Sequence, residues 1–128
     1  MATWEDVRER ALALPEVTEG EMGHLNTSSF TVRDKAFLWE RPLRKADLEE
    51  LGDRAPDGTV LAARVADEGA KLALIADDPG VFFTTAHFDG YPAVLVRLDV
   101  LAPEDLDEIV IEAWLARAPT RLAKEFLG

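Results

Sequence analysis

Two histidines, His24 and His87, are the side chains of this sequence best suited to proton transfer or metal binding near neutral pH. His87 is the more suggestive one, because Asp89 and Tyr91 follow it and Asp89-Gly90 is a turn-forming dipeptide. Neither histidine belongs to an HExxH or comparable pattern of metal ligands. Binding residues favour loops on rigid scaffolds, so we interpret the segment from His87 to Tyr91 as a candidate binding loop.

The chain lacks the motifs of the common catalytic and cofactor sites. It contains no cysteine, which excludes a disulfide framework, a thiolate metal site and a cysteine nucleophile. No glycine-rich phosphate loop, GxSxG or GxGxxG pattern occurs. Glu and Asp are frequent, but their spacing alone does not indicate acid–base catalysis. We therefore expect a protein that is not an enzyme and that uses no metal or cofactor.

Basic residues gather in one part of an otherwise acidic chain. The sequence has 14 Lys and Arg against 25 Asp and Glu, a net charge of −11, which argues against general affinity for nucleic acid or anionic membranes. Between residues 33 and 45, however, basic residues outnumber Asp34 and Glu40. The five basic residues of this segment, called the basic set below, are Arg33, Lys35, Arg41, Arg44 and Lys45. Trp39 and Phe37 lie among them, so this segment could combine base stacking with phosphate contacts.

Two other surfaces give alternative functions. Residues His87, Phe88, Asp89, Tyr91 and Arg97 would form a protein-interaction or small-ligand site, visible as an exposed concave patch lined by Phe88 and Tyr91. Glu5, Asp6 and Glu9 would form a weaker, cation-binding acidic ridge, because hard cations prefer carboxylate oxygens.

The length of 128 residues suits a single domain spanning residues 1–128 with a core of its own. The polar, acidic start of the sequence does not resemble a signal peptide, and no apolar run approaches the length of a membrane span. Together with the absence of cysteine, this predicts a cytoplasmic protein with no membrane partner. The pattern demands no oligomer, so we expect a monomer or a weak homodimer formed through a sheet edge.

The first half of the chain predicts one helix followed by short strands. Thr3 and Asp6 resemble a capping box that begins a helix over residues 4–14. Strands are expected over residues 19–25, which include His24, and over 29–33 and 36–40, with a tight turn at Asp34-Lys35. Phe37 and Trp39 are expected on one strand face. A short helix over residues 47–51 should end at Gly52.

The second half is organised around a hairpin from Pro79 to Val100. We expect strands over residues 60–65, 81–86 and 93–100, with the hairpin at the centre of the sheet and a turn at Asp89-Gly90. A helix over residues 67–76 should direct Leu72, Ile75 and Ala76 inward. Pro103 should begin the clearest helix, and residues 120–127 a short terminal one. The fold class is therefore α+β, a mainly antiparallel sheet covered on one face by helices.

Several segments, in this order, resemble the MmcQ/YjbR-like family over nearly the whole chain. They are residues 12–17, 29–32, 35–37, 79–85, 90–94, 96–99, 112–114, 118–119 and 121–122. The resemblance implies a CyaY-like two-layer sandwich and binding of double-stranded DNA through two hairpin wings, with no catalytic residues. The wings would be the hairpins around Asp34-Lys35 and Asp89-Gly90. The likeness of this fold to frataxin-type proteins is the second basis of the cation-binding alternative.

Overall fold

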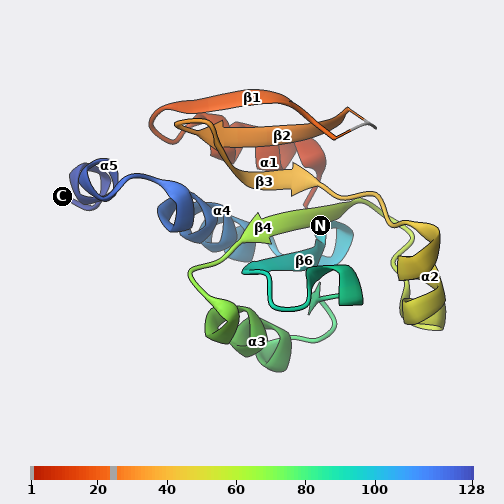
Figure 1. The fold of residues 1–128 in the computed structure, drawn as a ribbon. Helices are drawn as coiled ribbons and strands as arrows, with labels where there is room; N and C mark the ends of the chain where they lie inside the picture. Colours follow the sequence, from red (N-terminus) through yellow and green to blue (C-terminus); the bar gives the residue numbers. More distant parts are fainter. Residues whose placement is uncertain (1, 24–25) are drawn as a thin grey trace.

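The computed structural model describes residues 2–23 and 26–128, so the predictions for His24 and Leu25 lie outside the described residues. Figure 1 shows an antiparallel sheet, which has six strands in the described residues, in the order β1-β2-β3-β4-β6-β5. The strands are β1 (Val17–Met22), β2 (Thr27–Val32), β3 (Lys35–Glu40), β4 (Val60–Arg64), β5 (Phe82–Phe83) and β6 (Ala93–Arg97). The predicted α+β class is confirmed.

Five helices accompany the sheet in this part of the chain. They are α1 (Trp4–Leu12), α2 (Lys45–Leu51), α3 (Glu68–Asp77), α4 (Pro103–Arg117) and α5 (Thr120–Leu127), with 3₁₀ turns η1 (Gly52–Arg54), η2 (Ala86–Phe88) and η3 (Leu98–Val100). The predicted capping box of Thr3 and Asp6 begins α1. Pro103 is at the start of α4 as predicted. None of the described helices is both long and apolar enough to cross a membrane.

The main core lies between one face of the sheet and the helices α1 and α4. Val94 and Val96 of β6 enter it, as their alternation predicts. The apolar residues that recur at helical spacing along α4 are buried: Leu106, Ile109, Val110, Ala113 and Trp114. The Trp114 side chain is fully buried, and its Nε1 donates a hydrogen bond to the carbonyl of Pro15 at 3.1 Å. This contact fixes α4 to the chain that enters β1.

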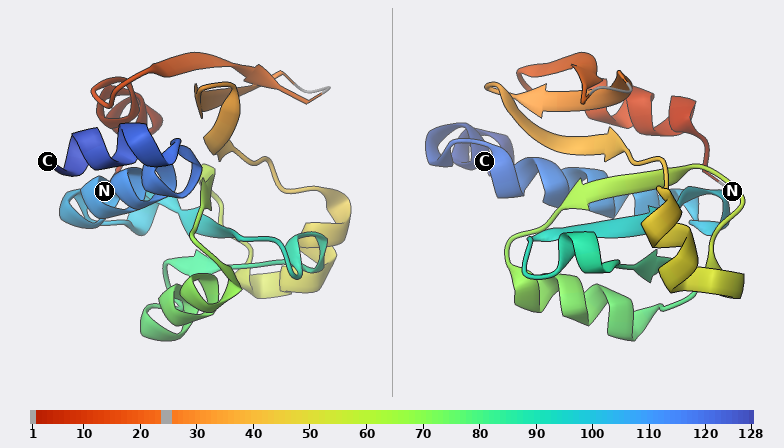
Figure 2. Two further views of the ribbon diagram at one scale, coloured as in Figure 1. Left: turned by 60° about the vertical axis from the view of Figure 1, so that its left-hand side comes forward. Right: turned by 45° about the vertical axis from the view of Figure 1, so that its right-hand side comes forward.

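A smaller apolar cluster lies on the opposite face of the sheet. Trp39, Phe83, Phe88 and Leu95 are buried in it, together with Leu51 of α2. The left view of Figure 2 shows α2 and the connection before β6 on this side, away from α1 and α4. The sheet is therefore covered mainly by helices on one face and by α2 and a structured loop on the other.

The prediction that Phe37 and Trp39 share a strand face is wrong, although both are buried. Phe37 belongs to the main core and Trp39 to the smaller cluster. The cause is a bulge in the pairing of β2 with β3. Phe30 lies opposite Leu38, but the next residue, Thr31, lies opposite Ala36, so Phe37 has no partner. The extra residue reverses the alternation and places Trp39 on the second face.

The hairpin predicted at the centre of the sheet lies at its edge. β5 is the edge strand, and it contains only Phe82–Phe83 instead of residues 81–86. After Phe83 the chain leaves the sheet, and the backbone N–H of Ala86 donates to the Glu50 carboxylate of α2 at 2.9 Å. The predicted turn at Gly90 is present, with φ at +74°. Residues 86–91 form a structured connection, called the 86–91 loop below.

Several boundaries also differ from the prediction: α1 ends at Leu12 rather than at residue 14, and β6 ends at Arg97, where the 3₁₀ turn η3 replaces the expected strand up to residue 100. β1 begins at Val17 rather than at residue 19. The turn between β2 and β3 consists of Arg33 and Asp34, one residue earlier than predicted, and both have positive φ, at +48° and +69°. A two-residue hairpin turn with two positive φ angles is the type whose twist suits antiparallel strands. The helix expected over residues 47–51 begins at Lys45.

The inward face of α3 differs from the prediction. Leu72 is 56% exposed and Ala76 is also exposed, while Lys71 is buried. Ala70, Leu74 and Ile75 pack against the main core. The expected helix is therefore present, but its inward face contains a lysine at the position next to the leucine that we expected inside.

Candidate functional site

A cavity of about 580 Å³, called the central hollow below, opens on the second face of the sheet. Ala36 and Trp39 of β3 line it, as do Met22, Gly23 and Thr27 from the β1–β2 hairpin. Its other lining residues are Glu40, Arg41, Pro42, Arg44, His87, Phe88, Asp89, Gly90, Tyr91 and Arg117. The structure thus brings part of the basic set together with most of the predicted loop site.

A buried lysine fixes the backbone of the 86–91 loop. The Lys71 side chain is 1% exposed. Its Nζ donates hydrogen bonds to the carbonyl of Phe88 at 2.6 Å and to the carbonyl of Tyr91 at 3.1 Å. Glu68, one helical turn earlier, places a carboxylate oxygen 3.8 Å from Nζ. A charged donor with two carbonyl acceptors holds the ends of a four-residue segment at fixed positions.

Aromatic contacts fix the side chains of the same loop. The Arg64 guanidinium donates to the Tyr91 hydroxyl at 2.9 Å and lies 4.9 Å from the centre of its ring. His87 meets the Phe88 ring edge-on, with the ring centres 5.0 Å apart. Phe88 is buried, whereas His87 and Tyr91 are exposed. The loop therefore presents two accessible rings on a backbone that is already ordered.

Arg41 lies beneath the 86–91 loop rather than on an exposed wing. Its side chain is 8% exposed, and its Nη2 lies 3.2 Å from an Oδ2 atom of Asp47, which is 5% exposed. It also donates to the carbonyl of Pro42, and its guanidinium lies 5.3 Å from the centre of the Phe88 ring. Burial lowers the pKa of the Arg41 guanidinium. Asp47 also accepts a hydrogen bond from the backbone N–H of Arg44 at 2.8 Å.

The basic set is divided between the two ends of β3. Arg33 and Lys35 are at the β2–β3 turn, and Arg41, Arg44 and Lys45 follow the other end, roughly 17 Å away at the usual rise of a strand. Arg33 forms an ion pair with Glu16, with Nη2 3.0 Å from Oε2. This hydrogen bond raises the pKa of Arg33 and lowers the pKa of Glu16. Lys35, Arg44 and Lys45 are exposed.

Arg97 is separated from the rest of the predicted loop site. Its guanidinium lies 4.8 Å from the centre of the Phe83 ring. It lines a different cavity of about 490 Å³, beside β5 and the segment that follows α2. The structure therefore groups His87, Phe88, Asp89 and Tyr91 but leaves Arg97 elsewhere.

Met22 and Arg117 are among the lining residues that were not singled out from the sequence, whereas Trp39 was expected to stack on bases beside the basic set. Trp39 reaches the central hollow through the bulge at Phe37, which sequence alternation does not reveal. Arg117 is the last residue of α4, and its Nε is buried without a hydrogen-bond partner among the described residues. The only available signal was a basic residue just before Ala118-Pro119, where a helix must end.

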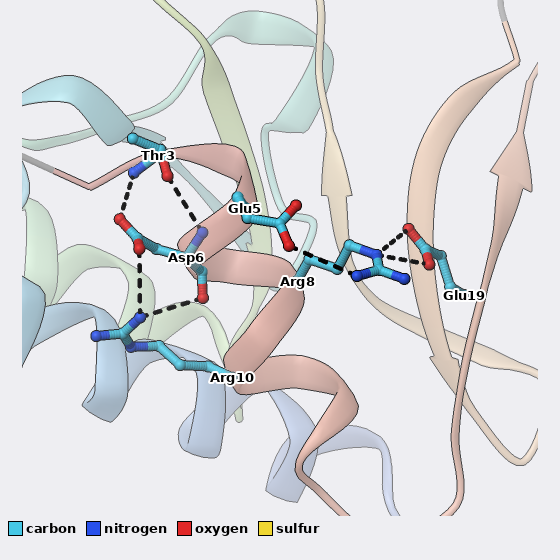
Figure 3. Close-up of polar contacts among 6 residues, drawn as sticks. All are labelled: Thr3, Glu5, Asp6, Arg8, Arg10 and Glu19. Carbon is cyan, nitrogen blue, oxygen red and sulfur yellow. Dashed lines mark hydrogen bonds and ion pairs between the residues drawn. The ribbon is translucent and has the colours of Figure 1, made fainter.

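Arginines and the helix cap contact two of the acidic residues of α1, Glu5 and Asp6, as Figure 3 shows. Asp6 accepts from the Thr3 backbone N–H at 2.9 Å and lies 3.9 Å from Arg10. The hydrogen bonds from Thr3 lower the pKa of the Asp6 carboxyl. Arg8 lies 3.5 Å from Glu5 and 2.9 Å from Glu19.

Among residues 2–23 and 26–128, no group of three or more His, Cys, Asp or Glu is placed to hold a metal ion. Within that part of the chain, the carboxylates of Glu5 and Asp6 act as partners of arginines and of a helix cap. This arrangement offers no support there for the cation-binding alternative.

Comparison with known proteins gives one family match and several relatives. The model of the YjbR family matches residues 12–116. The uncharacterized proteins Rv2570 of Mycobacterium tuberculosis strain H37Rv and Mb2600 of Mycobacterium bovis are each 51% identical over 131 residues, covering 100% of this chain and 98% of the relative. The crystal structure of Deinococcus radiodurans protein DR2400, with domain DUF419, has a TM-score of 0.67 at 22% identity. It covers 90% of this chain and 78% of that chain, and it supports the fold.

Proposed function

The chain belongs to the YjbR family, and on that premise we propose that it is a non-enzymatic binding module that takes a small ligand in the central hollow. One observation carries the proposal: Arg41 and Arg44 line the same cavity as His87, Phe88 and Tyr91. Residues from separate predicted sites, about 45 positions apart in sequence, converge there. The volume of about 580 Å³ falls within the range of ordinary ligand pockets.

The order of the 86–91 loop supports ligand binding. Lys71 holds two of its carbonyls and Arg64 holds the Tyr91 ring. A loop that is already ordered loses little conformational entropy when a ligand arrives, so more of the contact energy contributes to affinity.

The loop chemistry supports a binding role without catalysis. Thr84 donates its hydroxyl hydrogen to the carbonyl of Thr85, and the His87 ring packs edge-on against Phe88. Neither contact joins a nucleophile to a base, which covalent catalysis requires.

The proposed site is tested by fluorine-detected fragment screening of the wild-type protein and single variants. We expect fragments that bind the wild type to bind Arg44→Ala and Tyr91→Ala at least about tenfold more weakly, a loss of about 1.4 kcal/mol of binding free energy. Arg121→Ala is the matched control, because its side chain is 93% exposed on α5 and does not line the cavity. No fragment binding, or binding equally insensitive to all three substitutions, would exclude the central hollow as the site.

Duplex DNA is the second candidate ligand, favoured by the exposure of Lys35, Arg44 and Lys45. Three phosphate contacts would weaken binding about 40-fold between roughly 50 and 200 mM salt. We expect the double substitution Arg44→Glu with Lys45→Glu to remove such binding, as measured by anisotropy of labelled duplex DNA. Arg41 is unsuitable for charge reversal, because a carboxylate there would face buried Asp47.

A double substitution of equal charge on α5, Arg121→Glu with Lys124→Glu, is the control for the DNA experiment. Both double variants change the net charge by the same amount, so a general electrostatic effect would weaken DNA binding equally in the two. DNA binding through the basic set is wrong if no binding occurs at the lower salt concentration or if the two double variants behave alike.

A further inference from the structure

We infer that the central hollow selects a planar aromatic ligand bearing one anionic group, a chemistry that mononucleotides and aromatic carboxylates share. This inference rests on the proposed function and adds the class of ligand to it. It follows from the lining: aromatic rings and guanidinium groups border one cavity, and opposite charges balance around it.

The aromatic part of the inference comes from the rings along the cavity. Trp39 is 9% exposed and Phe88 is 5% exposed, so they form an apolar lining with little accessible area. Tyr91 is 43% exposed, and the Arg64 guanidinium close to its ring holds the side chain in place. A positioned, exposed ring is a surface on which a planar aromatic group can stack.

The anionic part comes from arginines whose donors are available. Arg41 forms an ion pair with Asp47, whereas Arg44 is exposed and has no ion pair among the described residues. Arg117 is half-buried, and its Nε is buried without an acceptor in the same part of the chain. A buried donor without a partner costs free energy, and a ligand oxygen that accepts a hydrogen bond from the guanidinium would offset this cost. Guanidinium groups pair well with carboxylate and phosphate oxygens.

The acidic lining limits the charge of the ligand. Glu40 and Asp89 also border the central hollow, so they balance the two available arginines. The local balance allows one anionic group to approach in a chain of net charge −11, but it gives no extended positive surface for a polyanion. A compact ligand with a single anionic end fits this lining better than a nucleic acid duplex.

Isothermal titration with four probes tests the inference. AMP and 2-naphthoate carry an aromatic group and an anionic group, adenosine lacks the anion, and ribose 5-phosphate lacks the aromatic ring. We expect AMP or 2-naphthoate to bind at least about tenfold more tightly than both adenosine and ribose 5-phosphate. Preference for AMP identifies a nucleotide-like ligand, and preference for 2-naphthoate identifies an aromatic carboxylate; each supports the inferred class.

Variants locate the anionic contact. Arg44→Ala or Arg117→Ala should weaken the preferred probe about tenfold and should leave adenosine nearly unchanged, while Arg121→Ala should change neither. Arg44 is exposed, so its variant should fold even if Arg117→Ala does not. The ligand class is overturned if fragments bind in the central hollow but neither aromatic anion is preferred, and the proposed function then stands. If no fragment binds there, the proposed function itself fails.

Discussion

Replacing Lys71 by methionine is expected to lower the free energy of unfolding by about 2–3 kcal/mol, because methionine retains most of the buried volume but has no donor. The carbonyls of Phe88 and Tyr91 would both lose the ammonium group that lies 2.6 and 3.1 Å from them. Relief from burying a charge offsets part of this loss. The free energy is measured by urea unfolding.

The same substitution should loosen the 86–91 loop more than the rest of the fold. The backbone N–H of Tyr91 donates to the carbonyl of Phe88 at 3.0 Å, and that of Asp89 donates to the carbonyl of Ala86 at 3.1 Å. We expect faster hydrogen exchange at these amides and weaker fragment binding in the central hollow. Lys124→Met, at an exposed position of α5, is the control. If the loop amides exchange as slowly in Lys71→Met as in the wild type, Lys71 does not position the loop.

The elements that the sequence predicted best are those whose apolar pattern decides their packing. The spacing from Leu106 to Trp114 defines one face of a helix, and every residue of that stripe is buried. In β6, Val94 and Val96 alternate with Leu95 between the two faces, as a period of two requires. These patterns are local, so neighbouring residues suffice to predict them.

The elements that differ from the prediction depend on residues that are distant in the sequence. Lys71 can be buried on α3 only because two carbonyls, 17 and 20 residues later, accept its hydrogens. The bulge at Phe37 depends on the pairing with β2, and the run of apolar residues in β3 reads the same with or without it. β5 ends at Phe83, and the chain that follows it contacts α2, where the Ala86 N–H donates a hydrogen bond to Glu50.

The candidate site was predicted in pieces for the same reason. The sequence singled out His87 to Tyr91 by turn chemistry and Arg41 to Lys45 by charge, but it did not show that they share a cavity. Their convergence depends on a contact across the second face of the sheet, where the Arg41 guanidinium lies 5.3 Å from the centre of the Phe88 ring. The position of Arg41 also differs from the prediction. We expected Arg41 to contact phosphate, but it is buried beneath Phe88 and forms an ion pair with Asp47.

Replacing Asp47 by alanine is expected to have the largest effect of any substitution near the central hollow, about 3–5 kcal/mol of unfolding free energy. The change leaves the Arg41 guanidinium buried without its carboxylate partner. It also removes the acceptor for the Arg44 backbone N–H at the start of α2, worth about 1 kcal/mol of that loss. Urea unfolding measures the loss, and fragment binding should weaken because Arg41 and Arg44 both line the cavity.

Two further variants separate the buried charge from the helix cap. Asp47→Asn retains an oxygen acceptor for the Arg44 N–H but removes the negative charge, so its loss should arise mainly from Arg41. The double substitution Arg41→Met with Asp47→Leu removes both charges, and a buried pair replaced by apolar groups of similar volume often leaves stability nearly unchanged. We therefore expect the double variant to be more stable than Asp47→Ala, although it lacks the same carboxylate. If the double variant is as unstable as Asp47→Ala, the loss of unfolding free energy comes from the helix cap and from packing. It then does not come from the buried, unpaired Arg41 guanidinium.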